Sequence, residues 1–244
     1  MKNLLSHLAG AAIAFSLCIS GAAQDYPELE TFMNSAQGLS TLYRGKQALK
    51  YPGPYNGNEY WASKKFETGD ILFEGKLYRG VSINIDAAAQ EALVRPGGHV
   101  VSVALPADMV DYLTMDGVKF VNLHKKYQAL PSGFYEVLYA GKNSVYKRVM
   151  KRMNSSVESV NGSPIGYDDP YYRNDVFEYF EYKADYYFQD EAGKISKIRR
   201  KRDLIRKFPD KKRAIRRYAN ETGISGSSTS YDVYCQQVLK FAEQ

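Results

Sequence analysis

The stretch that most constrains the fold is residues 59–86, EYWASKKFETGDILFEGKLYRGVSINID, which has the pattern of a tight β-hairpin. Glu74-Gly75 is a candidate for its two-residue turn, because glycine readily takes the positive φ that such turns require. After this turn, Val81, Ile83 and Ile85 alternate with polar residues, which is the period of a half-buried strand. The hairpin predicts an antiparallel β protein and indicates nothing about chemistry.

Further alternating runs follow this hairpin. We expect strands or hairpins at residues 92–95, 99–105, 118–123, 132–149, 176–188 and 194–200. A short helix or turn is expected from Pro106 to Leu113, and Asp116-Gly117 has the sequence of a second hairpin turn. Residues 154–169, rich in Ser, Asn, Gly and Asp, are expected to form a surface loop. One face of the longest strand is expected to point into the core: Phe180, Tyr182, Ala184, Tyr186 and Phe188.

After Arg200 the hydrophobic spacing changes to that of helices. Leu204, Ile205 and Phe208 fit a short helix, Pro209-Asp210 breaks the chain after it, and Ile215, Tyr218 and Ala219 lie on one face of a second helix. The last helix is the clearest, since its apolar residues recur at i, i+3, i+4, i+7 and i+8, and Thr229 or Ser230 can cap it. The predicted fold class is α+β: an antiparallel β-rich body, built as hairpins, a sheet or a partly closed barrel, followed by a C-terminal pair of helices.

The first 23 residues have the pattern of a secretory signal peptide. Lys2 supplies the positive charge, residues 4–19 are mostly apolar, and Gly21-Ala22-Ala23 forms a small-residue cleavage site. An uncleaved anchor is the alternative, but the apolar run is shorter than the ~20 residues that a spanning helix needs. We therefore predict an exported protein of the periplasm or cell envelope, or a secreted one, with no transmembrane segment once the signal is removed.

The mature chain divides by pattern into three parts. Residues 24–58 form an N-terminal segment and loop, residues 59–200 the antiparallel β body, and residues 201–244 a helical segment packed on that body. A lipoprotein anchor at Cys18 is disfavoured because Leu17 stands where a small residue is expected. Loss of Cys18 with the signal leaves Cys235 as the only mature cysteine, so no intrachain disulfide can form. Its place on an apolar helix face predicts a buried structural thiol.

Positive charge is concentrated near the C-terminus. The formal charge is +6, or +5 without Lys2. Residues 194–217, here called the basic segment, hold thirteen Lys or Arg against two acids, so they carry +11 and the rest of the mature chain −6. Such runs are usually solvated helix faces, and contact with an anionic envelope surface is the functional alternative. The candidate contact residues are Lys211, Lys212, Arg216 and Arg217. Export disfavours nucleic acid as a partner.

A second candidate contact is aromatic. Tyr55, Tyr60 and Trp61 lie beside a Pro/Gly loop and could stack a sugar or a peptide, although a plug of the core is the simpler interpretation. His99 and His124 lack the close ligand spacing of a zinc site. The sequence contains no nucleophile elbow, P-loop or dinucleotide fingerprint. We therefore assign no catalytic residue, no metal ligand and no cofactor.

Paired carboxylates need no sequence motif, so spacing alone cannot identify a hydrolase that uses them. Asp168-Asp169 lies in a turn-rich loop, and Glu178 and Glu181 fall on opposite faces of a strand. Solvated carboxylates are therefore the simpler interpretation. The sequence favours a non-enzymatic envelope protein that binds an unidentified envelope protein or an anionic surface. The alternative is a hydrolase of an envelope polymer whose carboxylates are assembled by the fold.

Several short motifs occur in a fixed order along most of the mature chain. They are Leu42-Tyr43-x-Gly45, Tyr60-Trp61-x-Ser63-x-x-Phe66-x-x-Gly69-x-Ile71, Gly75-x-x-Tyr78, Gly133-Phe134-Tyr135-x-Val137-Leu138-Tyr139-x-Gly141-Lys142 and Leu204-Ile205-x-x-Phe208-Pro209-Asp210-Lys211-Lys212. In this order the chain resembles a family of secreted proteins of unknown function from Bacteroidetes. The resemblance implies export and this architecture and carries no activity. Ile83-Asn84-Ile85-Asp86 departs from the pattern, since an aromatic residue is expected before the Asp.

Overall fold

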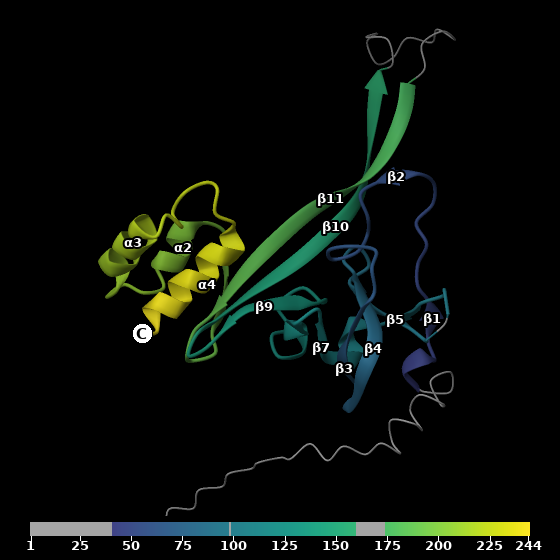
Figure 1. The fold of residues 1–244 in the computed structure, drawn as a ribbon, viewed down its shortest axis with the longest axis horizontal. Coiled ribbons are helices and arrows are strands. Elements are labelled where there is room, and N and C mark those ends of the chain that lie inside the picture. Colours follow the sequence, from purple (N-terminus) through teal and green to yellow (C-terminus); the bar gives the residue numbers. More distant parts are fainter. Residues whose placement is uncertain (1–40, 98, 160–173) are drawn as a thin grey trace, which may run out of the picture. The chain divides into compact units, whose positions relative to one another are not determined.

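A computed structural model describes residues 41–97, 99–159 and 174–244, and its strands form one open sheet (Figure 1). The strand order is β1-β6-β5-β4-β3-β7-β8-β9-β10-β11-β12, with β2 paired to β11 outside this path. The strands are β1 (Lys46–Gln47), β2 (Tyr55–Asn56), β3 (Glu67–Phe73), β4 (Lys76–Asp86), β5 (Glu91–Arg95), β6 (Val103–Leu105), β7 (Val110–Met115), β8 (Val118–Val121), β9 (Tyr135–Ala140), β10 (Ser144–Ser159), β11 (Asn174–Gln189) and β12 (Ile195–Ile198). Short 3₁₀ turns lie at Thr41–Tyr43, Ala107–Met109 and Leu123–Lys125. The predicted signal peptide lies outside the described residues, as does Asp168-Asp169.

The β3–β4 hairpin forms as predicted from its turn. Glu74 and Gly75 both have positive φ, 49° and 75°, which is the two-residue geometry that matches the twist of a hairpin. The predicted apolar face of β4 is buried, and so is its polar face near the strand's end, at Asn84 and Asp86. Residues 61–65 cover that second face. The Asn84 amide donates to the carbonyls of Ser63 and Lys65.

The region between β5 and β8 differs from the prediction in two places. The strand expected at residues 99–105 forms only at 103–105, and Val100 and Val101 are exposed. The helix or turn expected from Pro106 to Leu113 is a single 3₁₀ turn that leads directly into β7. β7 pairs along β3, with Leu113 opposite Ile71, so pairing with a distant strand outweighs the local helical pattern. The predicted turn at Asp116-Gly117 is confirmed, with φ of 50° and 72°.

β10 and β11 form one long hairpin whose register runs from Ser144 opposite Gln189 to Ser159 opposite Asn174. Residues 154–159 therefore belong to a strand and not to the predicted loop, because each has a partner in β11. β9 and β12 pair only with the end of this hairpin that includes Gln189. Figure 1 shows β10 and β11 continuing past β9.

The inward face predicted for β11 is buried at Phe188 and partly buried at Phe180, Ala184 and Tyr186. Tyr182 departs from the prediction, since it is 54% exposed. Tyr187, on the opposite face, is also buried, and its ring packs edge-on against Tyr135 at 5.4 Å. Both faces of the sheet are thus covered at the C-terminal end of β11.

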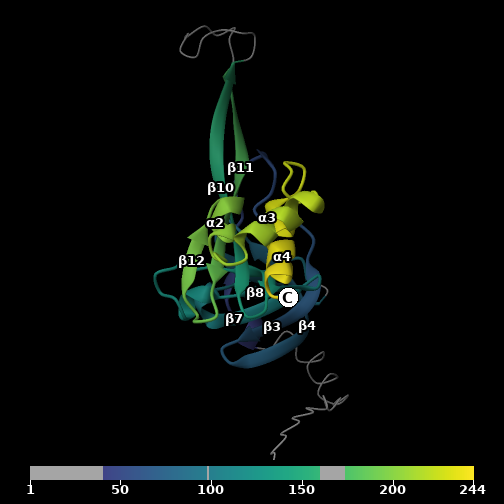
Figure 2. The same cartoon turned by 90° about the vertical axis from the view of Figure 1, so that its left-hand side faces the viewer.

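The helical segment contains α2 (Lys201–Ile205), α3 (Lys212–Glu221) and α4 (Tyr231–Ala242) in the described part of the chain. Figure 2 shows them as one group in front of the sheet. The predicted cap of α4 is confirmed, since the Ser230 hydroxyl accepts the Val233 N–H. The helices and the sheet share one apolar cluster: Leu138, Val145, Phe188, Ile198, Leu204, Ile205, Ile215, Ala219, Tyr234, Cys235, Val238 and Leu239. Cys235 is buried as predicted, and burial raises its pKa to about 12.

An ion pair inside the fold fixes α4 against the sheet. Lys147 of β10 donates to the Asp232 carboxylate of α4 at 2.6 Å and lies 3.4 Å from Glu136 of β9. The Tyr186 hydroxyl of β11 donates to the other Asp232 oxygen, also at 2.6 Å. One helix carboxylate is therefore held by two neighbouring strands.

The fold is α+β and β-rich, as predicted, with two corrections. A partly closed barrel does not form among the described residues: the path ends at β1 and β12, and β12 leads into α2 instead of pairing with β1. The helical segment also contains three helices where the fold class predicts a pair, because the short helix expected around Leu204 and Ile205 forms as α2, buries both side chains and belongs to the helical layer. Among the strands that the structure describes, one pairing is parallel, that of β2 with β11.

Gly69 gives a direct test of the sheet. A methyl group at this position would collide with the carbonyl oxygen of Thr114 on β7, where the β3–β4 register shifts. Gly69→Ala should lower the free energy of unfolding by about 1–3 kcal/mol in denaturant melts, the usual effect of overpacking. Gly226→Ala is the control, since its methyl group would make only ordinary contacts. Equal effects of the two substitutions would contradict the β3–β7 pairing.

Candidate functional site

The three aromatic residues nominated from the sequence lie in one segment, residues 51–61, here called the strap. They do not form a single stacking surface, because each ring packs edge-on against a different partner. Tyr55 contacts Phe180, Tyr60 contacts Phe66, and Trp61 contacts Phe120. The Trp61 backbone N–H donates to Ile85 of β4 at 2.9 Å, so the strap runs along the end of that strand. This placement resembles a plug more than an open platform.

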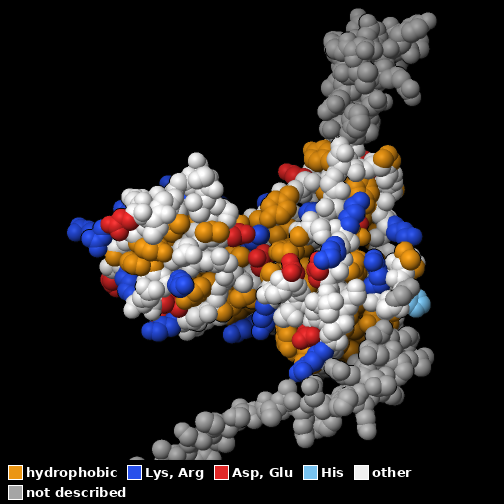
Figure 3. Space-filling model, viewed as in Figure 1, with side chains coloured by type: hydrophobic (Ala, Val, Ile, Leu, Met, Phe, Trp, Pro, Cys, Tyr) orange, Lys and Arg blue, Asp and Glu red, His pale blue; other side chains and the backbone are white. Residues whose placement is uncertain are grey.

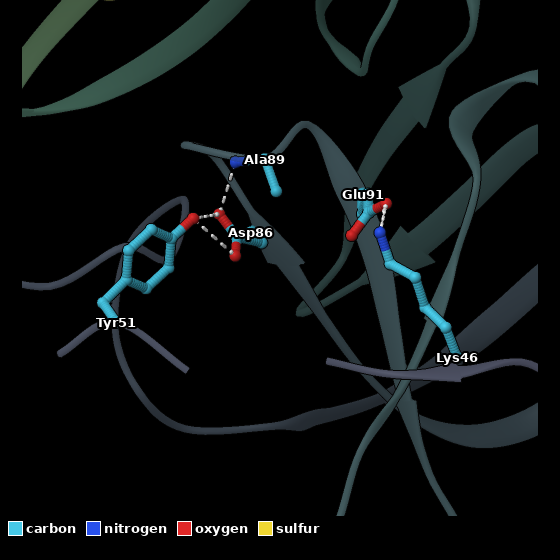
Figure 4. A network of polar contacts seen from close by, with 5 residues as sticks. All are labelled: Lys46, Tyr51, Asp86, Ala89 and Glu91. Atoms are coloured by element: carbon cyan, nitrogen blue, oxygen red, sulfur yellow. Dashed lines mark hydrogen bonds and ion pairs between the residues drawn. The ribbon is translucent and has the colours of Figure 1, made fainter. Parts of the chain in front are cut away.

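Two buried carboxylates that the sequence did not single out lie at the strap, one on it and one on β4 beneath it. Glu59 is 8% exposed and Asp86 is 2% exposed. One oxygen of Asp86 accepts the backbone N–H groups of Ala88 and Ala89, both at 2.8 Å, and both oxygens lie within 3.3 Å of the Tyr51 hydroxyl (Figure 4). The Glu59 carboxylate accepts the Tyr55 hydroxyl at 3.2 Å. The fold thus assembles an acid pair from the strap and from β4.

Burial sets the electrostatics of this pair. It raises the pKa of Asp86 above its usual range, and the nearby Glu59 charge adds to the rise, while the hydrogen bonds from Ala89, Ala88 and Tyr51 oppose it. Burial also raises the pKa of Tyr60 to about 12, with a further contribution from Glu59. Lys151 is the nearby cation. Its pKa is lowered by burial, although both carboxylates favour its charged form.

The same residues connect β4 with the β10–β11 hairpin, which lies elsewhere in the strand order. Phe180 of β11 packs edge-on against both Tyr51 and Tyr55, with ring centroids 5.0 Å apart in each case. Lys151 of β10 donates its ammonium to Asn58 of the strap at 2.8 Å, and its backbone N–H to Ala87 at 3.0 Å. We call this set the carboxylate–tyrosine cluster: Tyr51, Tyr55, Glu59, Asp86, Lys151 and Phe180. Its carboxylates bind groups of their own chain, so the arrangement holds β4, β10 and β11 together.

The basic segment is the second candidate, and its nominated residues fall into two groups. Lys211 donates to the carbonyl of Ala242 at 2.6 Å, at the end of α4. Lys212 and Arg216 are exposed, and Arg217 is exposed beside Glu221 at 4.0 Å. Such an exposed pair contributes little to stability.

The structure adds Arg213 to this group. It is exposed one helical turn before Arg217, whereas Ile215 and Ala219 point into the core. The spacing of Ile215 and Ala219 indicates the same orientation from sequence, because Arg213 falls on the opposite side of the helix. Figure 3 shows Lys and Arg side chains spread over the helical group.

Few acids offset these cations. The positive end of the helix dipole disfavours cations in the first turn of α3, where Lys212 and Arg213 lie. That turn has no acidic residue to offset them. Asp203 accepts the backbone N–H groups of Arg199 and Arg200 at the start of α2, and these bonds hold its pKa below the usual range. The outer face of α3 is therefore basic.

His99 and His124 belong neither to the carboxylate–tyrosine cluster nor to the basic segment. His124 Nδ1 lies 2.6 Å from the Leu130 carbonyl, and no group of three or more His, Cys, Asp or Glu within the described ranges is placed to hold a metal. No helix in the described part of the chain is long and apolar enough to cross a membrane. Comparison of the chain with protein-family models, curated proteins and solved structures finds no match.

The Tyr51 hydroxyl tests the carboxylate–tyrosine cluster. Tyr51→Phe should lower the free energy of unfolding by about 1–3 kcal/mol, because it takes a donor from a buried carboxylate. Tyr112→Phe is the control, since the described residues provide no hydrogen-bond partner for its hydroxyl, and it should change stability by less than about 0.5 kcal/mol. Chemical denaturation measures both. Equal losses would show that the Tyr51–Asp86 contact contributes nothing.

Asp86 also predicts a pH dependence. Its folded-state pKa is raised, so its contribution to stability is complete below about 3.8, the ordinary value, and is lost as the pH rises through the folded pKa. Asp86→Asn removes this titration. The stability of Asp86→Asn minus that of the wild type should therefore rise as the pH increases from about 4 through the folded pKa of Asp86, and then level off. A difference that is flat with pH, or that falls, would refute the burial of a titrating carboxylate.

Proposed function

We propose that this chain is an exported, non-enzymatic envelope protein that binds an anionic membrane surface through its basic segment. The observation that carries the proposal is the outer face of α3, where Lys212, Arg213, Arg216 and Arg217 are exposed around an inward-facing apolar stripe. Each Lys or Arg close to an anionic bilayer contributes about 1 kcal/mol to binding. Four of them on one helix would be enough to hold a protein there.

Two local features support an external anion. Arg213 and Arg217 are like charges at i, i+4, which destabilises a helix by a few tenths of a kcal/mol. Lys212 and Arg213 lie in the first turn, where the helix dipole also disfavours them. Phosphate groups facing α3 would relieve both repulsions.

The signal-peptide pattern and the resemblance to secreted Bacteroidetes proteins support export to the periplasm or cell envelope, or secretion. In that compartment the partner is an anionic lipid surface. An unidentified envelope protein remains the competing partner, and nucleic acid is not expected.

The alternative function is hydrolysis of an envelope polymer. One observation favours it: the fold brings Glu59 and Asp86 into electrostatic range, as a carboxylate-based hydrolase requires. Tyr55, Tyr60 and Trp61 would then contact the polymer. Against it, both acids are buried and hydrogen-bonded to their own chain. Release of soluble fragments from purified envelope polymer, abolished by Asp86→Asn in a folded variant, would support this alternative.

Vesicle co-sedimentation tests the membrane proposal. The protein should sediment with anionic vesicles at low salt and remain in the supernatant at high salt, because salt screens the contact. Changing Lys212, Arg213, Arg216 and Arg217 together to Gln should weaken binding at least tenfold. Lys211 is left unchanged because it holds the end of α4.

The control removes the same charge elsewhere. Lys64, Lys76, Lys119 and Lys126 are exposed on the β body, and changing all four to Gln lowers the net charge equally. Binding by α3 predicts that this variant still sediments at low salt. Equal losses in the two variants would show that net charge alone drives binding, and no sedimentation of the wild type would end the membrane proposal.

A further inference from the structure

The turn between β9 and β10 binds the carboxylate of Glu243, the residue that follows α4. One oxygen accepts the backbone N–H of Asn143 at 2.7 Å and its side-chain amide at 3.1 Å. The other accepts the backbone N–H of Lys142 at 3.1 Å and the Tyr139 hydroxyl at 3.0 Å. Four donors, two of them successive backbone amides, thus converge on one oxyanion, an arrangement that binds anions in many proteins.

The turn is shaped around this oxyanion. A methyl group at Gly141 would collide with the Glu243 carboxylate, so glycine leaves the space that the anion fills. Asn143 is 8% exposed, which removes its donors from competition with bulk water. The hydrogen bonds outweigh the effect of burial and lower the pKa of Glu243, so the group held there is a charged carboxylate.

A cleft of about 350 Å³ opens beside this turn, against the connection between α2 and α3. Three lysines are part of its lining, Lys142, Lys207 and Lys211, together with the acids Glu191 and Asp210 and Glu243 itself. Lys207 donates to the Ser196 hydroxyl at 2.7 Å and Lys211 to the Ala242 carbonyl at 2.6 Å. An ammonium group has three donors, so each lysine retains hydrogen-bonding capacity for an anion in the cleft.

Lys211 connects the cleft to the turn. It holds the carbonyl of Ala242, the residue directly before Glu243. An anion that drew the Lys211 ammonium into the cleft would release the last turn of α4 and, with it, the neighbouring carboxylate. Replacement of the Glu243 carboxylate by an anion from the cleft would therefore involve contacts that lie next to each other in the fold.

We propose that the β9–β10 turn is a phosphate receptor, occupied in cis by Glu243, which a phosphate group from the cleft can displace. The proposal rests on the proposed function in one respect, the source of the phosphate: at a membrane, the expected ligand is a phosphate-bearing lipid headgroup. Free phosphate has the same chemistry and is the other source. Because Glu243 is tethered beside the turn, it competes at a high effective concentration. The wild type should bind phosphate weakly, and removal of the Glu243 carboxylate should strengthen binding.

Titration with inorganic phosphate, followed by the NMR shifts of the Lys142 and Asn143 amides, tests the receptor. Glu243→Ala should bind phosphate about tenfold more tightly than the wild type, a coupling of ordinary size. Glu191→Ala is the matched control, since it removes one negative charge from the same cleft and leaves the turn occupied. It should bind phosphate within about twofold of the wild type. If Glu243→Ala proves poorly folded, Glu243→Gln should give a smaller gain of the same sign.

Three results would overturn the proposal. They are equal gains in affinity in the two alanine variants, no saturable binding by Glu243→Ala and Glu243→Gln, or NMR shift changes that do not include the Lys142 and Asn143 amides.

A second experiment separates the ligand sources. Vesicles containing phosphatidic acid should bind Glu243→Ala more tightly than the wild type if headgroups supply the phosphate, whereas binding of free phosphate alone assigns a soluble ligand. Loss of vesicle binding with phosphate binding retained would refute the membrane proposal and not the receptor.

Discussion

The contact between the Tyr51 hydroxyl and the buried Asp86 carboxylate is the constraint on which the rest of the β body depends. A carboxylate in an apolar interior is strongly unfavourable unless hydrogen bonds compensate for its lost hydration. Asp86 obtains them from the turn after β4 and from the strap, so these must stay together. Phe180, packed between Tyr51 and Tyr55, extends the constraint to the long β10–β11 hairpin. The buried Asp86 carboxylate and the tyrosines around it thus link the strap, β4 and the β10–β11 hairpin.

The two candidate sites differ in what their charges face. In the carboxylate–tyrosine cluster every described acid binds groups of its own chain, which suits a structural role. On α3 the exposed cations have little internal compensation and raise the local energy of the helix. Charges that destabilise their own helix and have few partners within the chain are typical of a surface that binds an external ligand. For this reason the function proposed for the chain rests on α3 and not on the buried acids.

Local signals predicted local structure well. The hairpin turns at Glu74-Gly75 and Asp116-Gly117 followed from the ability of glycine to take positive φ, and the Ser230 cap followed from the hydroxyl before an apolar helix pattern. Contacts between distant segments were missed. Pairing with β3 converted residues 110–115 to a strand. The burial of Asp86 was not foreseen, because alternation in β4 assigned it to solvent and the covering strap lies more than twenty residues earlier in the chain.

A double-mutant cycle between Tyr51→Phe and Asp86→Ala tests the central claim most directly, since alanine leaves no acceptor for the Tyr51 hydroxyl and the cycle isolates the energy of the pair from the effect of each side chain alone. Free energies of unfolding are measured at neutral pH for the wild type, both single variants and the double variant. The account predicts a coupling energy of about 1–3 kcal/mol between the two residues. Strictly additive effects would contradict it, because they would mean that the strap and β4 are held together by something other than this contact.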